Sequence, residues 1–121
     1  MPASRSILVR PRLYLGEGLS IGPGKIDLLR DLGRTHSISG AARALGMPYK
    51  RAWLLIDSLN QGFGRPVAET AVGGKGGGAH LTPLGEALVA AYDRLQARLN
   101  SAARTELTAF RELLAGPGRS A

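Results

Sequence analysis

Apolar residues recur at helical spacing in several stretches of this 121-residue chain. Ile26, Leu29 and Leu32 lie three residues apart, with Leu28 beside them, which predicts an amphipathic helix over about residues 24–36. A second stripe predicts a helix over about residues 48–61, and it consists of Ala52, Leu55, Ile56 and Leu59. The two stripes therefore predict a largely helical structure for this part of the chain.

Residues that favour the ends of helices predict a short helix between these two. Ser39 is a good N-cap for a helix over residues 40–45, because its hydroxyl can accept a backbone N–H of the first turn. Gly46 stands where a helix end favours the left-handed conformation, and Pro48 stands at the first position of the next helix. Gly62 and Gly64 are expected to end that next helix.

The longest apolar stripe covers residues 83–114, with Thr82 as N-cap and Pro83 at the first helical position. One continuous helix there would be about 48 Å long, more than a domain of this size can cover, so it needs a partner helix. We therefore expect a homodimer, with a possible break at Asn100–Ser101. The predicted dimerisation residues are Leu84, Leu88, Ala91, Leu95, Leu99, Ala102 and Phe110.

Two segments have the alternation of β-strands. Residues 7–15 predict an edge strand, since Pro11 lacks a backbone donor, and a turn follows at residues 16–18. Residues 66–82 predict a hairpin around a loop of five glycines and Lys75.

These elements predict a mainly α fold with a small β wing. The expected organisation is a winged helix-turn-helix over residues 1–82, built chiefly from residues 20–83, then a long dimerisation helix over residues 83–115. A disordered tail is expected over residues 116–121.

Charge adds a partner class to this picture. The formal net charge is +7, and residues 1–80 carry +6 of it. Such an excess favours a polyanion, and double-stranded DNA is the usual one, although many soluble proteins are basic. The chain has no cysteine and no run apolar enough for a membrane span or a signal peptide. We therefore expect a cytoplasmic protein that is not bound to a membrane.

Catalytic and metal chemistry find no support in the sequence. His36 and His80 lie too far apart for a metal-ligand motif, and no nucleophile–base set or carboxylate pair stands out. Asp27, Asp31 and Asp57 are interpreted as surface charges or local ion pairs. We expect neither an enzyme nor a bound metal or cofactor.

The segment from Ser39 to Leu59 has the pattern of a helix-turn-helix. Small Ala41 and Ala42 allow two helices to cross closely around a three-residue turn, and the second helix would enter a DNA major groove. Arg51 is suited to guanine and Lys50 and Tyr49 to phosphate or bases, unless these side chains only form a solvated face. Trp53 could stack or pack near DNA, but a lone tryptophan in a helix is more often buried, so it is interpreted as a core residue.

The glycine loop is interpreted as a wing, with Lys75 as its cation. It departs from the nucleotide P-loop because Gly76, and not a hydroxyl residue, follows the lysine. A flexible loop without a role is the alternative. The candidate DNA-binding residues are Ser39, Pro48, Tyr49, Lys50, Arg51, Lys75, Gly76 and Gly77.

Residues 37–60 and 73–82 together resemble the N-terminal DNA-binding domain of ModE-type molybdate-responsive regulators, whose helix-turn-helix is similar to that of LysR-type regulators. The resemblance extends over about residues 7–115. It implies a bacterial winged-helix regulator that binds palindromic operators as a dimer, with Tyr49, Lys50, Arg51 and Lys75 facing DNA. The family's C-terminal molybdate-binding domains have no counterpart before Ala121, so we expect no molybdate site in this chain.

Two other functions stay open at this stage. One is a protein-interaction module, in which the winged helix and the long helix dock a partner protein. The net charge of +7 also suits a non-specific, architectural DNA-binding protein.

Overall fold

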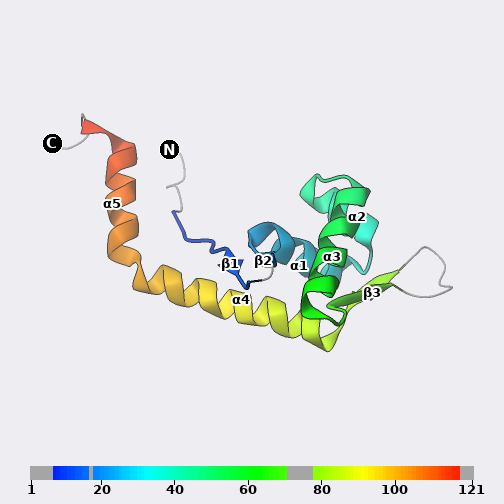
Figure 1. Cartoon of the computed structure of the whole chain (residues 1–121). Helices are drawn as coiled ribbons and strands as arrows, with labels where there is room; N and C mark the ends of the chain where they lie inside the picture. Colours follow the sequence, from blue (N-terminus) through cyan, green and yellow to red (C-terminus); the bar gives the residue numbers. More distant parts are fainter. Residues whose placement is uncertain (1–6, 17, 71–77, 118–121) are drawn as a thin grey trace.

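The computed structural model describes residues 7–16, 18–70 and 78–117. In this part the chain forms two short antiparallel hairpins and five helices (Figure 1). The elements in order are β1 (Leu13–Tyr14), β2 (Ser20–Ile21), α1 (Pro23–Thr35), α2 (Ile38–Leu45), α3 (Tyr49–Phe63), β3 (Ala68–Thr70), β4 (Ala79–Leu81), α4 (Pro83–Ala102) and α5 (Arg104–Ala115).

Helix α1 forms the centre of the domain. It begins at Pro23, whose fixed φ suits a first turn, and ends before His36, which adopts a left-handed conformation with φ of 57°. The predicted helix over residues 24–36 is confirmed within one residue at each end. Its four large apolar side chains, Ile26, Leu28, Leu29 and Leu32, are completely buried.

Helix α2 starts two residues earlier than the sequence indicated. The N-cap is Ser37, whose hydroxyl accepts a hydrogen bond of 2.9 Å from the Gly40 backbone N–H. The assignment of Ser39 as N-cap is therefore wrong, and Ser39 lies exposed inside the helix. The reason is Ile38, which is buried in the core as the first helical residue. Gly46 ends α2 in the left-handed conformation, as predicted.

Helix α3 is shifted by one residue at its start. Pro48, with an extended ψ of 148°, is the N-cap rather than the first helical residue. The helix also passes through Gly62 and ends at Gly64, whose φ of 69° is left-handed. The predicted buried stripe is confirmed for Ala52, Ile56 and Leu59, and Leu55 is half-buried.

The hairpin of β3 and β4 is anchored to the helix-turn-helix. Its register pairs Glu69 with His80, and residues 71–77 between the strands lie outside the described residues. Gly78 forms an antiparallel bridge with Ser37, and the Ala79 N–H donates to the His36 carbonyl at 3.0 Å. The base of the predicted wing is thus fixed against the junction of α1 and α2.

The long C-terminal stripe forms two helices instead of one. Thr82 caps α4 as predicted, accepting from the Gly85 N–H at 3.1 Å and donating to the Pro66 carbonyl at 2.8 Å. The chain then turns sharply at Ala103, so α5 points away from the line of α4 (Figure 1). The break lies just after the predicted Asn100–Ser101.

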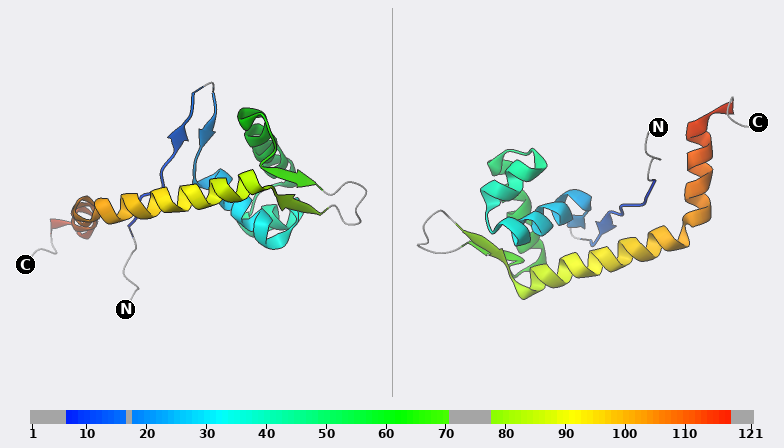
Figure 2. Two further views of the ribbon diagram at one scale, coloured as in Figure 1. Left: turned by 90° about the horizontal axis from the view of Figure 1, so that it is seen from below. Right: turned by 180° about the vertical axis from the view of Figure 1, so that it is seen from behind.

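The N-terminal segment is mostly not a strand. Only Leu13–Tyr14 pairs, with Ser20–Ile21, and the predicted strand over residues 7–15 is wrong for its first six residues. Residues 7–12, called here the N-terminal strap, run beside α4 (Figure 2). The Tyr92 hydroxyl donates to the Pro11 carbonyl at 2.7 Å and holds the strap there.

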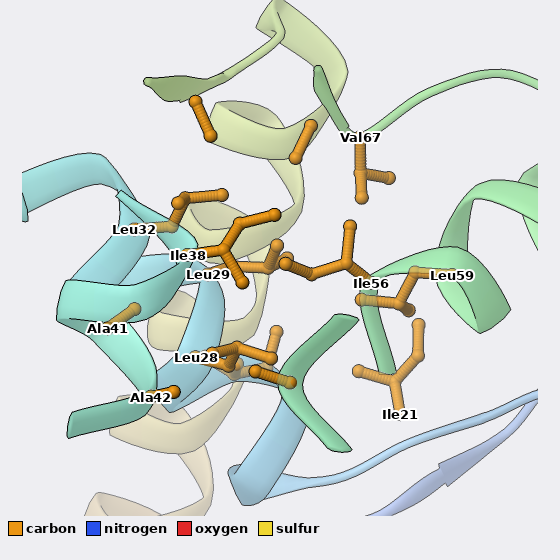
Figure 3. Packing of buried hydrophobic residues seen from close by; sticks show 14 of the residues in the cluster. Ile21, Leu28, Leu29, Leu32, Ile38, Ala41, Ala42, Ile56, Leu59 and Val67 are labelled. Atoms are coloured by element: carbon orange, nitrogen blue, oxygen red, sulfur yellow. The ribbon is translucent and has the colours of Figure 1, made fainter. Parts of the chain in front are cut away.

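The core lies where α1, α2, α3 and the base of the β3–β4 hairpin meet (Figure 3). It is almost purely aliphatic, and Tyr92 of α4 is its one aromatic member among the described residues. Each fully buried Leu or Ile contributes about 1.5–3 kcal/mol through the hydrophobic effect. None of the helices in the described ranges combines the length and apolarity that crossing a bilayer requires.

Candidate nucleic-acid interface

Helix α3 turns one face to the core and presents the other to solvent. Ala52, Ile56 and Leu59 fix its orientation, because all three are buried. The 3.6-residue period then leaves the first turn and the opposite face outside. Its exposed side chains include Tyr49, Lys50, Arg51, Trp53 and Leu54.

Three cations near the start of α3 carry unneutralised charge. Arg43 in the last turn of α2, and Lys50 and Arg51 in the first turn of α3, make no ion pair within the described residues. Arg30 and Arg34 are paired in contrast, since Arg30 lies 2.5 Å from Asp93 and Arg34 lies 2.9 Å from Asp31. Unpaired cations also occur elsewhere in the described residues, for example on α4 and α5, so what suits a polyanion here is the position of the three at the start of the solvent-facing α3.

The sequence-predicted site residues fall into three groups. Tyr49, Lys50 and Arg51 are exposed side by side in the first turn of α3, directly after the exposed N-cap Pro48. Ser39 is exposed on the neighbouring helix α2. The predicted wing residues Lys75, Gly76 and Gly77 lie outside the described residues.

The interpretation of Trp53 as a core residue is wrong. Its side chain is 44% exposed and lies one helical turn after Tyr49. The sequence could not decide this, because Trp53 adjoins the buried Ala52 and lies three residues before the buried Ile56. Its exposure depends on how far the β3–β4 hairpin stands from α3.

A cavity of about 530 Å³ separates α3 from that hairpin. Its lining includes Trp53, Asp57 and Asn60 from α3 and Glu69 from β3. The Asn60 amide bridges the two elements, accepting from the Val67 N–H at 2.7 Å and donating to the Ala68 carbonyl at 3.4 Å. The two hydrogen bonds of Asn60 therefore fix the hairpin to α3 on one side of the cavity.

The predicted dimerisation stripe divides into two parts. Leu84 and Leu88 pack against the core of their own chain, and Leu95 and Leu99 are half-buried. Ala91, Ala102 and Phe110 are exposed, and Leu113 and Leu114 extend the exposed apolar surface along α5. Within the described ranges, no residue of α5 is buried.

Acidic and histidine side chains do not gather into a metal site in the described part of the chain. His36 is a helix C-cap, and the His80 Nε2 lies 3.5 Å from a carboxylate oxygen of Glu69. Asp27 and Asp31 form ion pairs as predicted, whereas Asp57 forms none among the described residues.

Comparison with known proteins gives several relatives. The chain is 48% identical over 81 residues to the molybdenum-pterin-binding protein MopB of Rhodobacter capsulatus, covering 66% of this chain and 30% of MopB. It is 44% identical over 84 residues to the transcriptional regulator ModE of Yersinia pestis, covering 69% and 32%. It is also 34% identical over 126 aligned positions to the molybdenum transport protein ModE of Azotobacter vinelandii, and this alignment covers 94% of this chain and 46% of that protein.

A solved structure gives the fold. Full-length LysG, a LysR-type regulator from Corynebacterium glutamicum with bound arginine, matches with a TM-score of 0.54 and 22% identity, covering 74% of this chain and 29% of LysG. No protein-family model matches the sequence. The chain spans about a third to a half of the length of the curated relatives reported above.

These matches confirm the predicted fold class, a mainly α winged helix-turn-helix, and α4 in part confirms the long helix predicted after the wing. The relatives also confirm the resemblance to ModE-type regulators. The expectation that the chain is not an enzyme agrees with the relatives named as transcriptional regulators.

Proposed function

We propose that this chain, a homologue of ModE-type transcription regulators, is a sequence-specific DNA-binding regulator. The observation that carries the proposal is the solvent-facing surface of α3, where unpaired Lys50 and Arg51 stand beside exposed aromatic side chains. A phosphate backbone and a base edge are the partners that this combination of charge and apolar surface fits together.

In the proposed complex α3 lies in the major groove. Its first turn enters most deeply, so Arg51 is placed to donate two hydrogen bonds to the N7 and O6 of guanine. Lys50, Tyr49 and the exposed Ser39 bind phosphates or base edges beside it. Lys75 and its neighbouring glycines would contact the backbone or the minor groove from the wing.

Two copies are proposed to act together. The exposed Ala91 and Ala102 on α4 and Phe110 on α5 need a cover, and a second copy of the same chain provides one with two-fold symmetry. A two-fold dimer binds a palindromic operator whose half-sites lie about one helical turn, roughly 10 bp, apart.

The controlled genes are proposed to concern molybdenum. The support lies in the relatives, whose names describe molybdenum-pterin binding and molybdenum transport. This part of the proposal concerns the biological setting and assigns no molybdate site to the residues of this chain.

The test is a selection from a random-sequence duplex library at about physiological salt, followed by sequencing and by fluorescence anisotropy with the enriched duplex. We expect an enriched palindrome and a marked preference over random DNA. The matched control is Arg34→Ala, which removes a cation already paired with Asp31 on α1.

Three outcomes separate the proposal from its rivals. Enrichment that Arg34→Ala preserves and Arg51→Ala abolishes supports it. Binding without enrichment contradicts it in favour of an architectural DNA-binding protein. No binding to any duplex contradicts both and favours a protein-interaction module.

A further inference from the structure

Large exposed apolar side chains gather in three places on the described surface. One group is on the N-terminal strap and the β1–β2 hairpin, one is on α5, and one is on α3. The α3 group consists of Tyr49, Trp53 and Leu54, which are 54%, 44% and 50% exposed. Tyr49 and Trp53 lie one helical turn apart on the same side of α3, whereas Leu54 lines a separate hollow beside Lys50 and Arg51.

The side chain of Trp53 has no hydrogen-bond partner among the described residues. Its ring stands at the cavity between α3 and the β3–β4 hairpin. Because the side chain is 44% exposed, part of the ring is accessible to a partner molecule.

The surroundings of Trp53 bear on the class of partner. Lys50 lies one turn before it on α3 and is not neutralised within the described residues, whereas Asp57 and Glu69 line the cavity at the ring's other side. An apolar protein surface does not require the cation, whereas a nucleic-acid duplex offers a phosphate to Lys50 and base edges to the exposed part of the ring. The proposed function therefore supplies the occupant of this surface.

Only one base edge in the major groove carries a methyl group. Thymine exposes it at C5, whereas the other bases present donors and acceptors and, in cytosine, a C5 hydrogen. We infer that Trp53 reads thymine, by packing its indole ring against that methyl group, so that the half-site has a fixed thymine opposite residue 53. This inference rests on the proposed function and names a specificity-determining residue within it.

Because Trp53 is the only tryptophan of the chain, its fluorescence reports on this one side chain. Acrylamide quenching is measured for the free protein and for the protein saturated with operator duplex, while labelled-duplex anisotropy reports binding separately. We expect the duplex to shield the ring and lower the quenching constant severalfold. Saturated binding with unchanged quenching overturns the inference and leaves the proposed function intact.

A second experiment identifies the contacted group. Each thymine of the operator is replaced in turn by deoxyuridine, which removes only the C5 methyl. Loss of one buried methyl weakens binding about fourfold, so the wild type is expected to show that loss at one position of each half-site. Trp53→Gln should lose this sensitivity, and Trp53→Leu should keep part of it.

Controls make the two failures distinguishable. Leu15→Gln changes an exposed apolar side chain beside the β1–β2 hairpin and should leave the deoxyuridine profile unchanged. A wild-type profile without any sensitive thymine overturns the inference, even if a Trp53 variant fails to fold. A profile that is the same in wild type and a folded Trp53→Gln also overturns it, whereas absence of any sequence preference overturns the proposed function as well.

Discussion

The side-chain amide of Asn100 binds both polar backbone groups of Val9, which lies 91 residues earlier in the chain. Its Oδ1 accepts from the Val9 N–H at 2.6 Å, and its Nδ2 donates to the Val9 carbonyl at 2.9 Å. This pair holds the N-terminal strap against α4, in the way that a neighbouring strand would.

Replacing Asn100 by alanine should release the strap. Both hydrogen bonds to Val9 are lost, and we expect a decrease of about 1–3 kcal/mol in the free energy of unfolding. Urea unfolding measures the decrease, and hydrogen exchange of the Val9 amide locates it. Ser101→Ala, at the exposed neighbouring position, is the control and should change neither. A stable Asn100→Ala with a protected Val9 amide would contradict this role.

The strap shows what local sequence patterns cannot supply. Residues 7–15 have the composition of a strand, yet only Leu13–Tyr14 pair with another strand, and the backbone of Val9 binds a side chain on α4 instead. No spacing rule connects positions 9 and 100, because the contact exists only after α4 has packed on the core. From the sequence, Asn100 is accordingly interpreted as a helix break, and its contact with Val9 is not predicted.

Other features were within reach of the sequence. The capping residues Thr82 and Gly46 predicted the start of α4 and the end of α2, because they act through local geometry. Tyr92 carried an overlooked signal, because it lies four residues after Leu88 and three before Leu95 on the predicted stripe. The break was predicted at Asn100–Ser101, but its exact place at Ala103 had no signal, because alanine favours helix.

Gly85 should not tolerate alanine. An added Cβ would lie 2.1 Å from the Val67 carbonyl oxygen, a backbone atom that cannot move without shifting β3 against α4. We expect Gly85→Ala to lower the unfolding free energy by about 1–3 kcal/mol, as overpacking does. The matched control is Gly24→Ala on α1, where nothing lies within 4 Å. Because alanine favours helix, this control should be neutral or stabilising, and equal effects at both positions would contradict the prediction.

The hydroxyl of Tyr92 makes stability depend on alkaline pH. Burial raises its pKa above the usual 10.0, with a smaller contribution from Asp27, because the phenolate is disfavoured there. The unfolded tyrosine therefore loses its proton near pH 10 while the folded one keeps it. The stability contributed by this group is complete below about pH 10 and declines as the pH rises through the raised value.

Tyr92→Phe tests this pH dependence. The variant loses the hydrogen bond to Pro11, so we expect it to be about 1 kcal/mol less stable at neutral pH. The difference from wild type should shrink between pH 9.5 and pH 11, measured by urea unfolding at each pH. Lys25, whose pKa is lowered by burial and by Arg12, contributes equally to both proteins. A constant difference would show that Tyr92 does not titrate as argued.

Phe110→Asp should separate the proposed dimer. The side chain is 58% exposed, and a charge at its position would be buried twice in a two-fold interface. We expect the dissociation constant to rise at least about a hundredfold, measured by light scattering over a concentration series. Thr105→Asp adds the same charge on another side of α5 and should preserve the dimer. A wild-type monomer at micromolar concentration would contradict the prediction at the outset.

Lys50 and Arg51 are adjacent, yet their replacement should have different consequences for DNA binding. Lys50 is proposed to meet a phosphate, so Lys50→Ala should weaken binding to all duplexes alike and reduce the salt slope by about 0.9. Arg51 is proposed to meet guanine, so Arg51→Ala should cost about 1–3 kcal/mol on the operator and less on random DNA. Anisotropy titrations at four salt concentrations with both duplexes distinguish the two effects. Arg34→Ala, whose cation is already neutralised by Asp31, should change neither quantity. The opposite result, in which Lys50→Ala alters the sequence preference and Arg51→Ala alters only the salt slope, would contradict this assignment. It would show that Lys50 meets the bases and Arg51 meets a phosphate.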